Sequence, residues 1–141
     1  MLAASVTMSV IASGEQKKML ARLQAWYESA AAALSTAVVL EMKETKWVVH
    51  TNSNTTNAPT GGYFAWLTLP ETCNIDELTV QTAKHQVAVL RGDRCVAGGR
   101  DDDLSFFASK QSVRLCFAYL DEAEIVEMVR RLARAVRAAT V

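Results

Sequence analysis

A short, almost entirely apolar segment bounded by structure-breaking residues is the feature that most limits the possible folds. Gly61 and Gly62 precede the segment Tyr63–Leu69, and Pro70 follows it. Glycine and proline in these places mark a turn and the end of a strand. An apolar run of this length predicts a β-strand that is covered on both faces. The chain therefore builds a sheet, although its longest regular pattern is helical.

Two helices are predicted ahead of this strand. Residues 2–12 form an apolar run that is too short to span a bilayer and has no basic residue before it, so we interpret it as the start of a buried helix. From about Glu15 to about Ser35, apolar residues recur every three or four positions, which predicts a long helix with one apolar face. The residues of that face are Met19, Leu23, Trp26, Ala30 and Leu34.

Three further segments predict short strands. Residues 47–50 and 87–90 are β-prone runs, and residues 113–118 alternate between apolar and mixed positions. The polar tract 51–60 and the stretch 96–103, which is rich in glycine and aspartate, separate these elements and predict loops.

Two more helices begin with capping signals. Asn74 and Glu77 have the spacing of a capping box, which predicts a helix from there to about Gln86. Asp121 and Glu124 repeat that spacing at the start of the last helix. The apolar face of this last helix consists of Ile125, Val129, Leu132 and Val136. Near its C-terminal end the helix carries four arginines: Arg130, Arg131, Arg134 and Arg137. Cations at this end of a helix interact favourably with its dipole, so we predict a solvated terminus there.

The order of these elements predicts an α+β fold. Two helices, two strands, a helix, two strands and a helix favour a small, mostly antiparallel sheet with helices covering one face. A chain of 141 residues is expected to form a single domain. Within it we expect residues 1–35 to be a helical lead-in segment and residues 59–141 to be the α+β core.

Composition and charge exclude several classes of protein. Half of the residues are apolar and 21% are charged, which is typical of a globular domain. Fifteen basic and fifteen acidic side chains cancel, so no long-range field gathers nucleic acid or an anionic membrane. We therefore expect neither of these partners.

The cysteine pattern gives no disulfide framework and no zinc site. Cys73, Cys95 and Cys116 are odd in number and far apart, which favours a reducing compartment and a cytoplasmic protein. Cys116 falls within a predicted strand and is expected to be a small buried residue.

Metal binding is not expected at the other candidate ligands either. The three aspartates 101–103 lack the alternating ligand spacing of a calcium loop. His50 and His85 have no partner placed near them in the sequence.

These segments, taken in order, resemble a known family. The series from Pro59 to Pro70 resembles a small-domain strand of class I/II, fold-type-I aminotransferases, which depend on pyridoxal phosphate (PLP); in that family a glycine pair precedes an aromatic strand. The downstream helix, strands and last helix follow in the same order. Residues 11–15 are similar to the helix end that leads into the long interdomain helix. The aminoadipate and MocR branches are the most similar in style.

The resemblance implies a division of labour between two domains. PLP forms a Schiff base with a lysine of the large domain and acts as an electron sink. That large domain is expected before residue 1, so we expect no catalytic, cofactor-binding or metal-binding residue in this chain. The small domain supplies an arginine for the substrate α-carboxylate, and Arg114 matches it. A guanidinium stays charged and offers two parallel donors to a carboxylate.

Each of these residues also has a structural interpretation. Arg114 can be a sheet arginine whose stem covers apolar surface. Tyr63 borders the substrate in relatives, but the residue pattern by itself favours an aromatic ring that fills the core. Arg91 is either a second anion contact or, as we favour, a solvated turn residue. The lysines lack the family's cofactor context and are expected at the surface; they are Lys17, Lys18, Lys43, Lys46, Lys84 and Lys110.

Two hypotheses for function follow. In the first, the chain is an aminotransferase C-terminal domain that needs the large domain, and with it PLP, for activity. In the second, it is a free-standing, non-catalytic module that dimerises or binds another protein. Residues 1–12 are the expected contact surface in the second case, because an apolar face without a neighbour usually forms an interface.

Overall fold

The computed structural model describes residues 2–42, 48–50, 62–95 and 110–141. The elements follow one another as α1 (Leu2–Ala12), α2 (Glu15–Glu41), β1 (Val48–His50), β2 (Phe64–Thr68), α3 (Ile75–Lys84), β3 (Leu90–Arg91), a 3-10 helix η1 (Gly92–Cys95), β4 (Ser112–Cys116) and α5 (Glu122–Ala139). Apart from η1, which the sequence did not predict, this is the predicted order. The predicted loops 51–60 and 96–103 lie outside the described residues.

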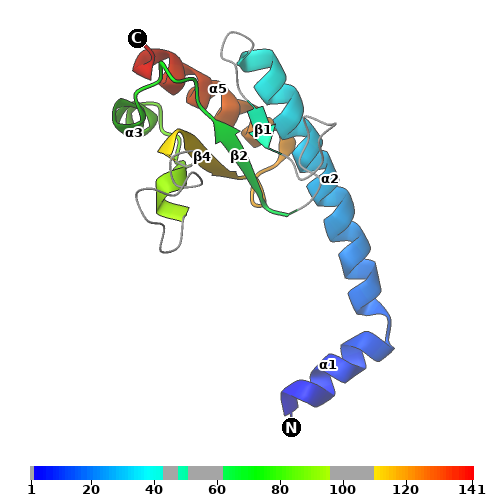
Figure 1. Cartoon of the computed structure of the whole chain (residues 1–141). Helices are drawn as coiled ribbons and strands as arrows, with labels where there is room; N and C mark the ends of the chain where they lie inside the picture. Colours follow the sequence, from blue (N-terminus) through cyan, green and yellow to red (C-terminus); the bar gives the residue numbers. More distant parts are fainter. Residues whose placement is uncertain (1, 43–47, 51–61, 96–109) are drawn as a thin grey trace.

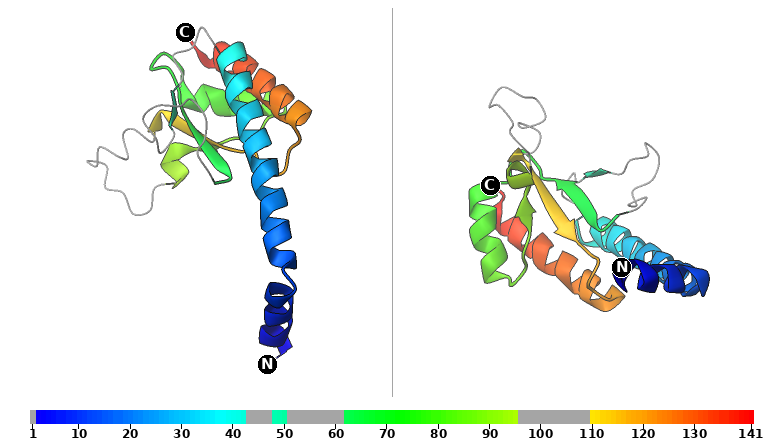
Figure 2. Two further views of the ribbon diagram at one scale, coloured as in Figure 1. Left: turned by 90° about the vertical axis from the view of Figure 1, so that its right-hand side faces the viewer. Right: turned by 90° about the horizontal axis from the view of Figure 1, so that it is seen from below.

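The strands form one antiparallel sheet in the order β1-β2-β4-β3. Helices α2, α3 and α5 lie on the same side of it (Figure 1), and the view from below shows the sheet and the helices as two layers (Figure 2). The predicted α+β class, with helices covering one face of a small sheet, is therefore confirmed.

The core lies between the inner face of the sheet and this helical layer. Leu67 of β2 and Val113 and Leu115 of β4 point inward and are fully buried. They meet the apolar face of α5, whose four predicted residues are all buried: Ile125, Val129, Leu132 and Val136.

The prediction that the aromatic strand is covered on both faces is wrong. Ala65 and Leu67 are buried, but Phe64 is 44% exposed and Trp66 is only half-buried. Successive side chains of a strand point to opposite faces, and in the part of the chain that the structure describes α2, α3 and α5 cover one of them. Apolar residues on both sides of β2 therefore leave an aromatic outer surface.

The helix starts agree with the predictions, with one exception. The side chain of Asp121 accepts a hydrogen bond from Glu124 N–H, and the Glu124 carboxylate accepts one from Asp121 N–H, which completes the box. Asn74 caps α3 through Asp76 N–H and Glu77 N–H. The Glu77 carboxylate instead accepts from Gln81, so the reciprocal bond of a box is replaced by a bond along the helix.

The first two helices differ from the predictions in length and burial. α2 continues past the predicted end at Ser35 to Glu41. There the C-terminal part of α2 packs on α5, and two of the arginines expected to be solvated bind it. Arg130 Nε is 2.8 Å from Glu41 Oε1, and Arg137 Nη2 donates to the Glu41 carbonyl at 2.7 Å.

α1 is not a buried helix. All of its described side chains, residues 5–12, are exposed, including Val6, Met8, Val10 and Ile11. Gly14, with a φ of 74°, joins α1 to α2, and Figure 1 shows the first half of α2 extending away from the sheet toward α1. A left-handed φ is strained in residues that carry a Cβ, so the glycine allows the backbone to leave the helical region here.

Candidate functional site

The outer face of the sheet carries the arginine that the sequence singles out. Arg114 lies in the middle of β4, opposite Trp66 of β2 on one side and Leu90 of β3 on the other. Because it is paired on both sides, the backbone at this position belongs to the most constrained part of the sheet. Phe64 lies opposite Cys116 and so occupies the same face, one diagonal step from Arg114.

An aromatic ring supports the Arg114 guanidinium. Its Cζ lies 4.1 Å from the centroid of the Phe64 ring, within the range of a cation–π contact. Among the described residues no carboxylate pairs with Arg114. The N–H groups of this half-exposed arginine are therefore available to an anion from outside this part of the chain.

Tyr63 occupies a different place from Arg114. Its ring is 51% exposed and packs edge-on against Tyr27 of α2, with centroids 5.0 Å apart and planes at 63°. The favoured interpretation, an aromatic that fills the core, is wrong because Tyr63 lies just before the start of β2, where about half of its surface stays exposed. The described contacts place Tyr63 beside the helical layer, whereas Arg114 lies on the outer face.

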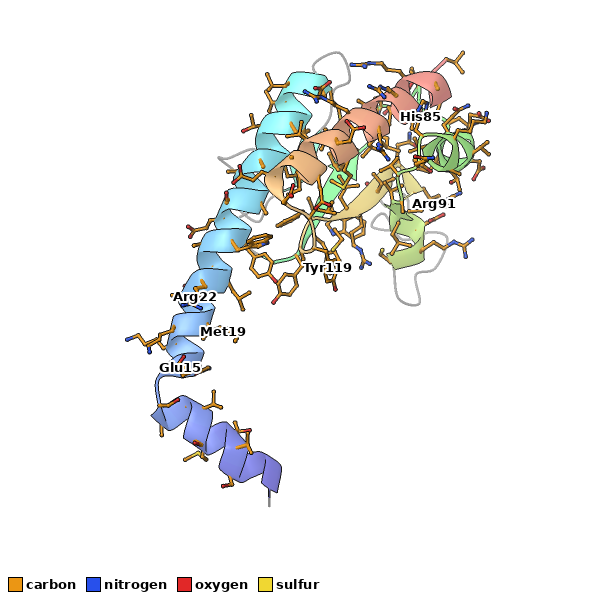
Figure 3. All side chains as sticks on the ribbon, turned by 180° about the vertical axis from the view of Figure 1, so that it is seen from behind. Glu15, Met19, Arg22, His85, Arg91 and Tyr119 are labelled. Atoms are coloured by element: carbon orange, nitrogen blue, oxygen red, sulfur yellow. The ribbon has the colours of Figure 1, made fainter. Side chains whose placement is uncertain are left out.

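Arg91 is neither an anion site nor a solvated turn residue. Its guanidinium forms ion pairs with Asp93, at 2.8 Å, and with Asp76 of α3. These hydrogen bonds, first that to Asp93, raise the pKa of Arg91 above its ordinary value. Figure 3 labels the residue where the sheet edge meets α3, so it ties these two elements together.

The described lysines all lie at the surface. A Schiff-base lysine lies in a desolvated pocket or beside another cation that activates it. Lys17, Lys84 and Lys110 are exposed at the surface, and so is Lys18, whose Nζ is 2.7 Å from Glu15. Their surface position agrees with the prediction, and Lys43 and Lys46 lie outside the described residues.

The remaining candidate ligands form no metal site in the described ranges. There, no three His, Cys, Asp or Glu side chains are grouped to hold an ion. The cysteines are free. Cys73 is buried, which raises the pKa of its thiol, whereas Cys116 is half-buried on the outer face and not buried as predicted. Asp101–Asp103 and the His50 side chain lie outside the described residues. No described helix is long and apolar enough to cross a membrane.

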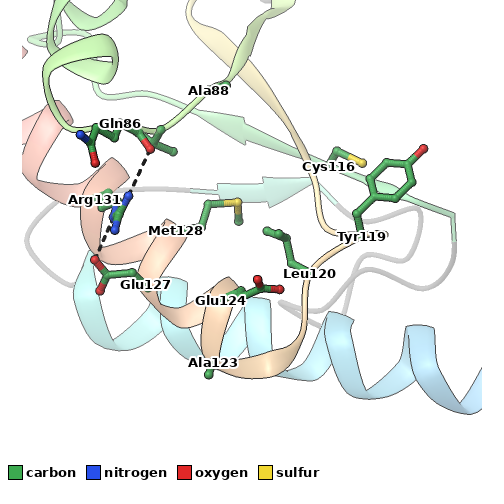
Figure 4. A pocket seen from close by; sticks show the side chains of 11 residues that line it. Gln86, Ala88, Cys116, Tyr119, Leu120, Ala123, Glu124, Glu127, Met128 and Arg131 are labelled. Atoms are coloured by element: carbon green, nitrogen blue, oxygen red, sulfur yellow. Dashed lines mark hydrogen bonds and ion pairs between the residues drawn. The ribbon is translucent and has the colours of Figure 1, made fainter.

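A groove that the sequence did not predict opens beside β4 (Figure 4). Its volume is about 590 Å³, and an ion pair lies at its rim, where Arg131 Nε is 2.8 Å from Glu127 and Arg131 Nη1 donates to the Gln86 carbonyl at 3.4 Å. Segments from α3–β3, β4 and α5 meet there, so no local pattern could have revealed it. The apolar lining residues are Val87, Ala88, Leu120, Ala123 and Met128.

The fold is that of an aminotransferase-like domain. No protein-family model matches the chain. The similar proteins are nevertheless PLP-dependent aminotransferases, and they cover most of its length.

In sequence, the chain is 33% identical over 79 residues to the 2-aminoadipate transaminase of Thermus thermophilus, a match that covers 56% of this chain and 18% of that enzyme. In structure, it is similar to LysN, the α-aminoadipate aminotransferase of Thermus thermophilus, with a TM-score of 0.66, 28% identity, and coverage of 92% of this chain and 29% of LysN. It is also similar to the multiple substrate aminotransferase of Thermococcus profundus, with a TM-score of 0.67 and 25% identity. That match covers 91% of this chain and 28% of the Thermococcus enzyme. The chain thus resembles one part, less than a third, of these enzymes.

Proposed function

We propose that this chain acts as the C-terminal small domain of a PLP-dependent aminotransferase, in which Arg114 binds the α-carboxylate of the amino acid substrate. The observation that supports this most is the Arg114 guanidinium on the open face of the sheet, stacked on Phe64 and without an acidic partner among the described residues. An arginine that served only the packing of the sheet would be expected to bind an acid of its own chain, as Arg91 does.

The proposed task suits an arginine on a central strand. The planar guanidinium matches a carboxylate through two parallel hydrogen bonds, which sets the direction of the substrate as well as its position. β4 is held by β2 and β3, so the base of the side chain is fixed. Placing a substrate accurately over a reactive group is a large part of catalysis.

The cofactor belongs to polypeptide outside these 141 residues in this proposal. PLP, when bound, supplies the electron sink for amino-group transfer. The described lysines are exposed and do not fit its Schiff-base site. We therefore propose that the chain alone is inactive.

The same proposal accounts for α1 and the first half of α2. α1 has no charged residue and exposes apolar side chains at positions all around the helix. A helix that is apolar all round is normally buried on all sides. Side-by-side pairing with one second copy would cover a single face, so a free-standing dimerisation module explains α1 less well than insertion against a larger domain.

A chimera tests the proposal directly. This chain would replace the matched part of the Thermus thermophilus 2-aminoadipate transaminase, with Arg114→Gln and Arg114→Lys made in the same background. Because two charge-assisted hydrogen bonds are lost, we expect Arg114→Gln to lower kcat/KM about 100-fold, with a smaller loss for Arg114→Lys. PLP absorbance confirms that each chimera holds the cofactor. A cofactor-loaded chimera whose Arg114→Gln form is as active as its parent would contradict the proposal.

A further inference from the structure

We propose that Phe64 is a positioning residue for Arg114: its ring holds the guanidinium so that the N–H edge stays open to a carboxylate. The inference rests on the proposed function of Arg114 and extends it to a second residue on another strand. Phe64 touches no reacting group in this proposal and acts only through the arginine.

The sheet register brings the two side chains together. Phe64 pairs with Cys116, two residues beyond Arg114, so Phe64 and Arg114 are diagonal neighbours on one face. Diagonal neighbours in an antiparallel pair are within reach of aromatic and long side chains. The distance of 4.1 Å from Cζ to the ring centroid is that of a guanidinium lying over the ring.

Stacking and carboxylate binding use different parts of the guanidinium. A ring contacts its π-face, whereas hydrogen bonds leave through the N–H groups at its edge. An acidic neighbour would occupy those donors, as Asp93 and Asp76 occupy those of Arg91. An aromatic neighbour thus restrains the arginine without competing for the ligand.

Core packing does not explain Phe64. Phe64 is 44% exposed, and the strand register places it on the same face of the sheet as Arg114. Its neighbours in the strand, Ala65 and Leu67, supply the buried face of β2. A long arginine side chain otherwise samples many rotamers, and a restrained one loses less freedom when it binds.

Nuclear magnetic resonance of the chain itself tests the inference. The Arg114 Nε–H and Hδ signals are followed in the wild type, Phe64→Leu and Phe64→Tyr while sodium acetate replaces chloride at constant ionic strength. We expect Phe64→Leu to remove the ring-current shift of Arg114 Hδ and to weaken the acetate response about two- to fivefold, the size of an exposed cation–π contact. Phe64→Tyr keeps the ring and should restore both signals.

Two controls separate positioning from general damage. Tyr119 is 88% exposed in the turn before α5, so Tyr119→Leu removes a surface aromatic and should leave the Arg114 signals unchanged. The methyl signals of Leu67 and Leu115 report the buried side of the same strands and should not move in Phe64→Leu.

The outcomes are distinguishable. A Phe64→Leu chain with the wild-type Arg114 shift and acetate response would overturn the positioning role, and so would a Phe64→Tyr chain that fails to restore them. If acetate leaves the Arg114 Nε–H signal of the wild type unchanged, the carboxylate role of Arg114 fails, whether or not the ring-current shift shows the stacking.

Discussion

The two halves of α2 carry the same apolar pattern in different surroundings. In the C-terminal half, Ala30 and Leu34 pack against the core, and Leu34 is fully buried. In the N-terminal half, the same face is open: Met19 is 64% exposed and Trp26 51% exposed. A 3.6-residue period identifies the apolar face of a helix, but the neighbouring elements decide whether that face is covered.

Under the proposed function, the difference indicates where the large domain would pack. α5 and the sheet cover the second half of α2, whereas the first half lines a hollow at the bend with α1. Val10, Met19, Leu23 and Trp26 are among the residues that line this hollow. Neighbouring apolar side chains that remain exposed along one helix are typical of an interface. The comparison therefore divides α2 into a part that stabilises this domain and a part that, under the proposed function, docks against the large domain.

Truncating one leucine in each half should give the largest contrast. Leu34→Ala removes a fully buried side chain, so we expect the free energy of unfolding to fall by about 2–5 kcal/mol. Leu23→Ala, at a site 41% exposed, should change it by no more than about 0.5 kcal/mol. Urea unfolding of the two variants measures both values. Equal losses would show that the N-terminal half is also part of the folded core.

Removing one ion pair from each half of α2 should give a smaller difference in the free energy of unfolding. Glu41→Gln removes the carboxylate that lies 2.8 Å from Arg130 and links α2 to α5, and we expect a loss of about 0.5–1 kcal/mol. Glu15→Gln breaks only the exposed pair with Lys18, for which we expect about 0–0.5 kcal/mol. Urea unfolding at low and at moderate salt measures both, and the Glu41 effect should shrink with salt. A larger loss for Glu15→Gln would reverse the comparison.

The smallest effect on stability should come from the ion pair between Glu127 and Arg131 of α5, the helix that covers the second half of α2. The hydrogen bond from Arg131, and the nearby arginine charges, lower the pKa of Glu127 below its ordinary value. Because the folded chain favours the ionised form, the stabilisation is present above the ordinary glutamate pKa. It is lost as the pH falls through the lower folded value.

Arg131→Gln should move the Glu127 pKa back up, as followed by the carboxyl carbon shift during an acid titration. Arg94→Gln, which changes an exposed arginine of η1, is the matched control and should leave it unchanged. An unchanged Glu127 titration in Arg131→Gln would contradict the assigned cause.

The sequence predicted the features that depend on neighbouring residues better than those that depend on contacts between distant segments. The start and apolar face of α5 were predicted correctly because a capping box and a helical stripe are local. Residues 87–90 predict a strand, but β3 is confined to Leu90 and Arg91. The residues before β3 do not pair with β4, because the chain separates from that strand where the groove of Figure 4 opens. This separation depends on the packing of several elements, so no local sequence pattern predicts it.

The candidate site was predictable only in part. Arg114 was identified by its resemblance to a family position, since a lone arginine in a strand has no local signature. Its contact with Phe64 depends on the register between two strands that are distant in sequence. Tyr63 was misplaced because the pattern of an apolar strand does not reveal at which residue the strand begins.

Amide hydrogen exchange along α2 tests the central comparison most directly, in the chain alone and in the chimera with the Thermus thermophilus enzyme. Exchange reports local opening, so an uncovered helix half exchanges faster than one in the core. We expect residues 19–26 to exchange faster than residues 30–38 in the chain alone and to become protected in the chimera, while residues 30–38 change little. Equal protection of both halves in a monomeric chain, or no gain of protection in a chimera that holds PLP, would contradict a docking role for the first half of α2.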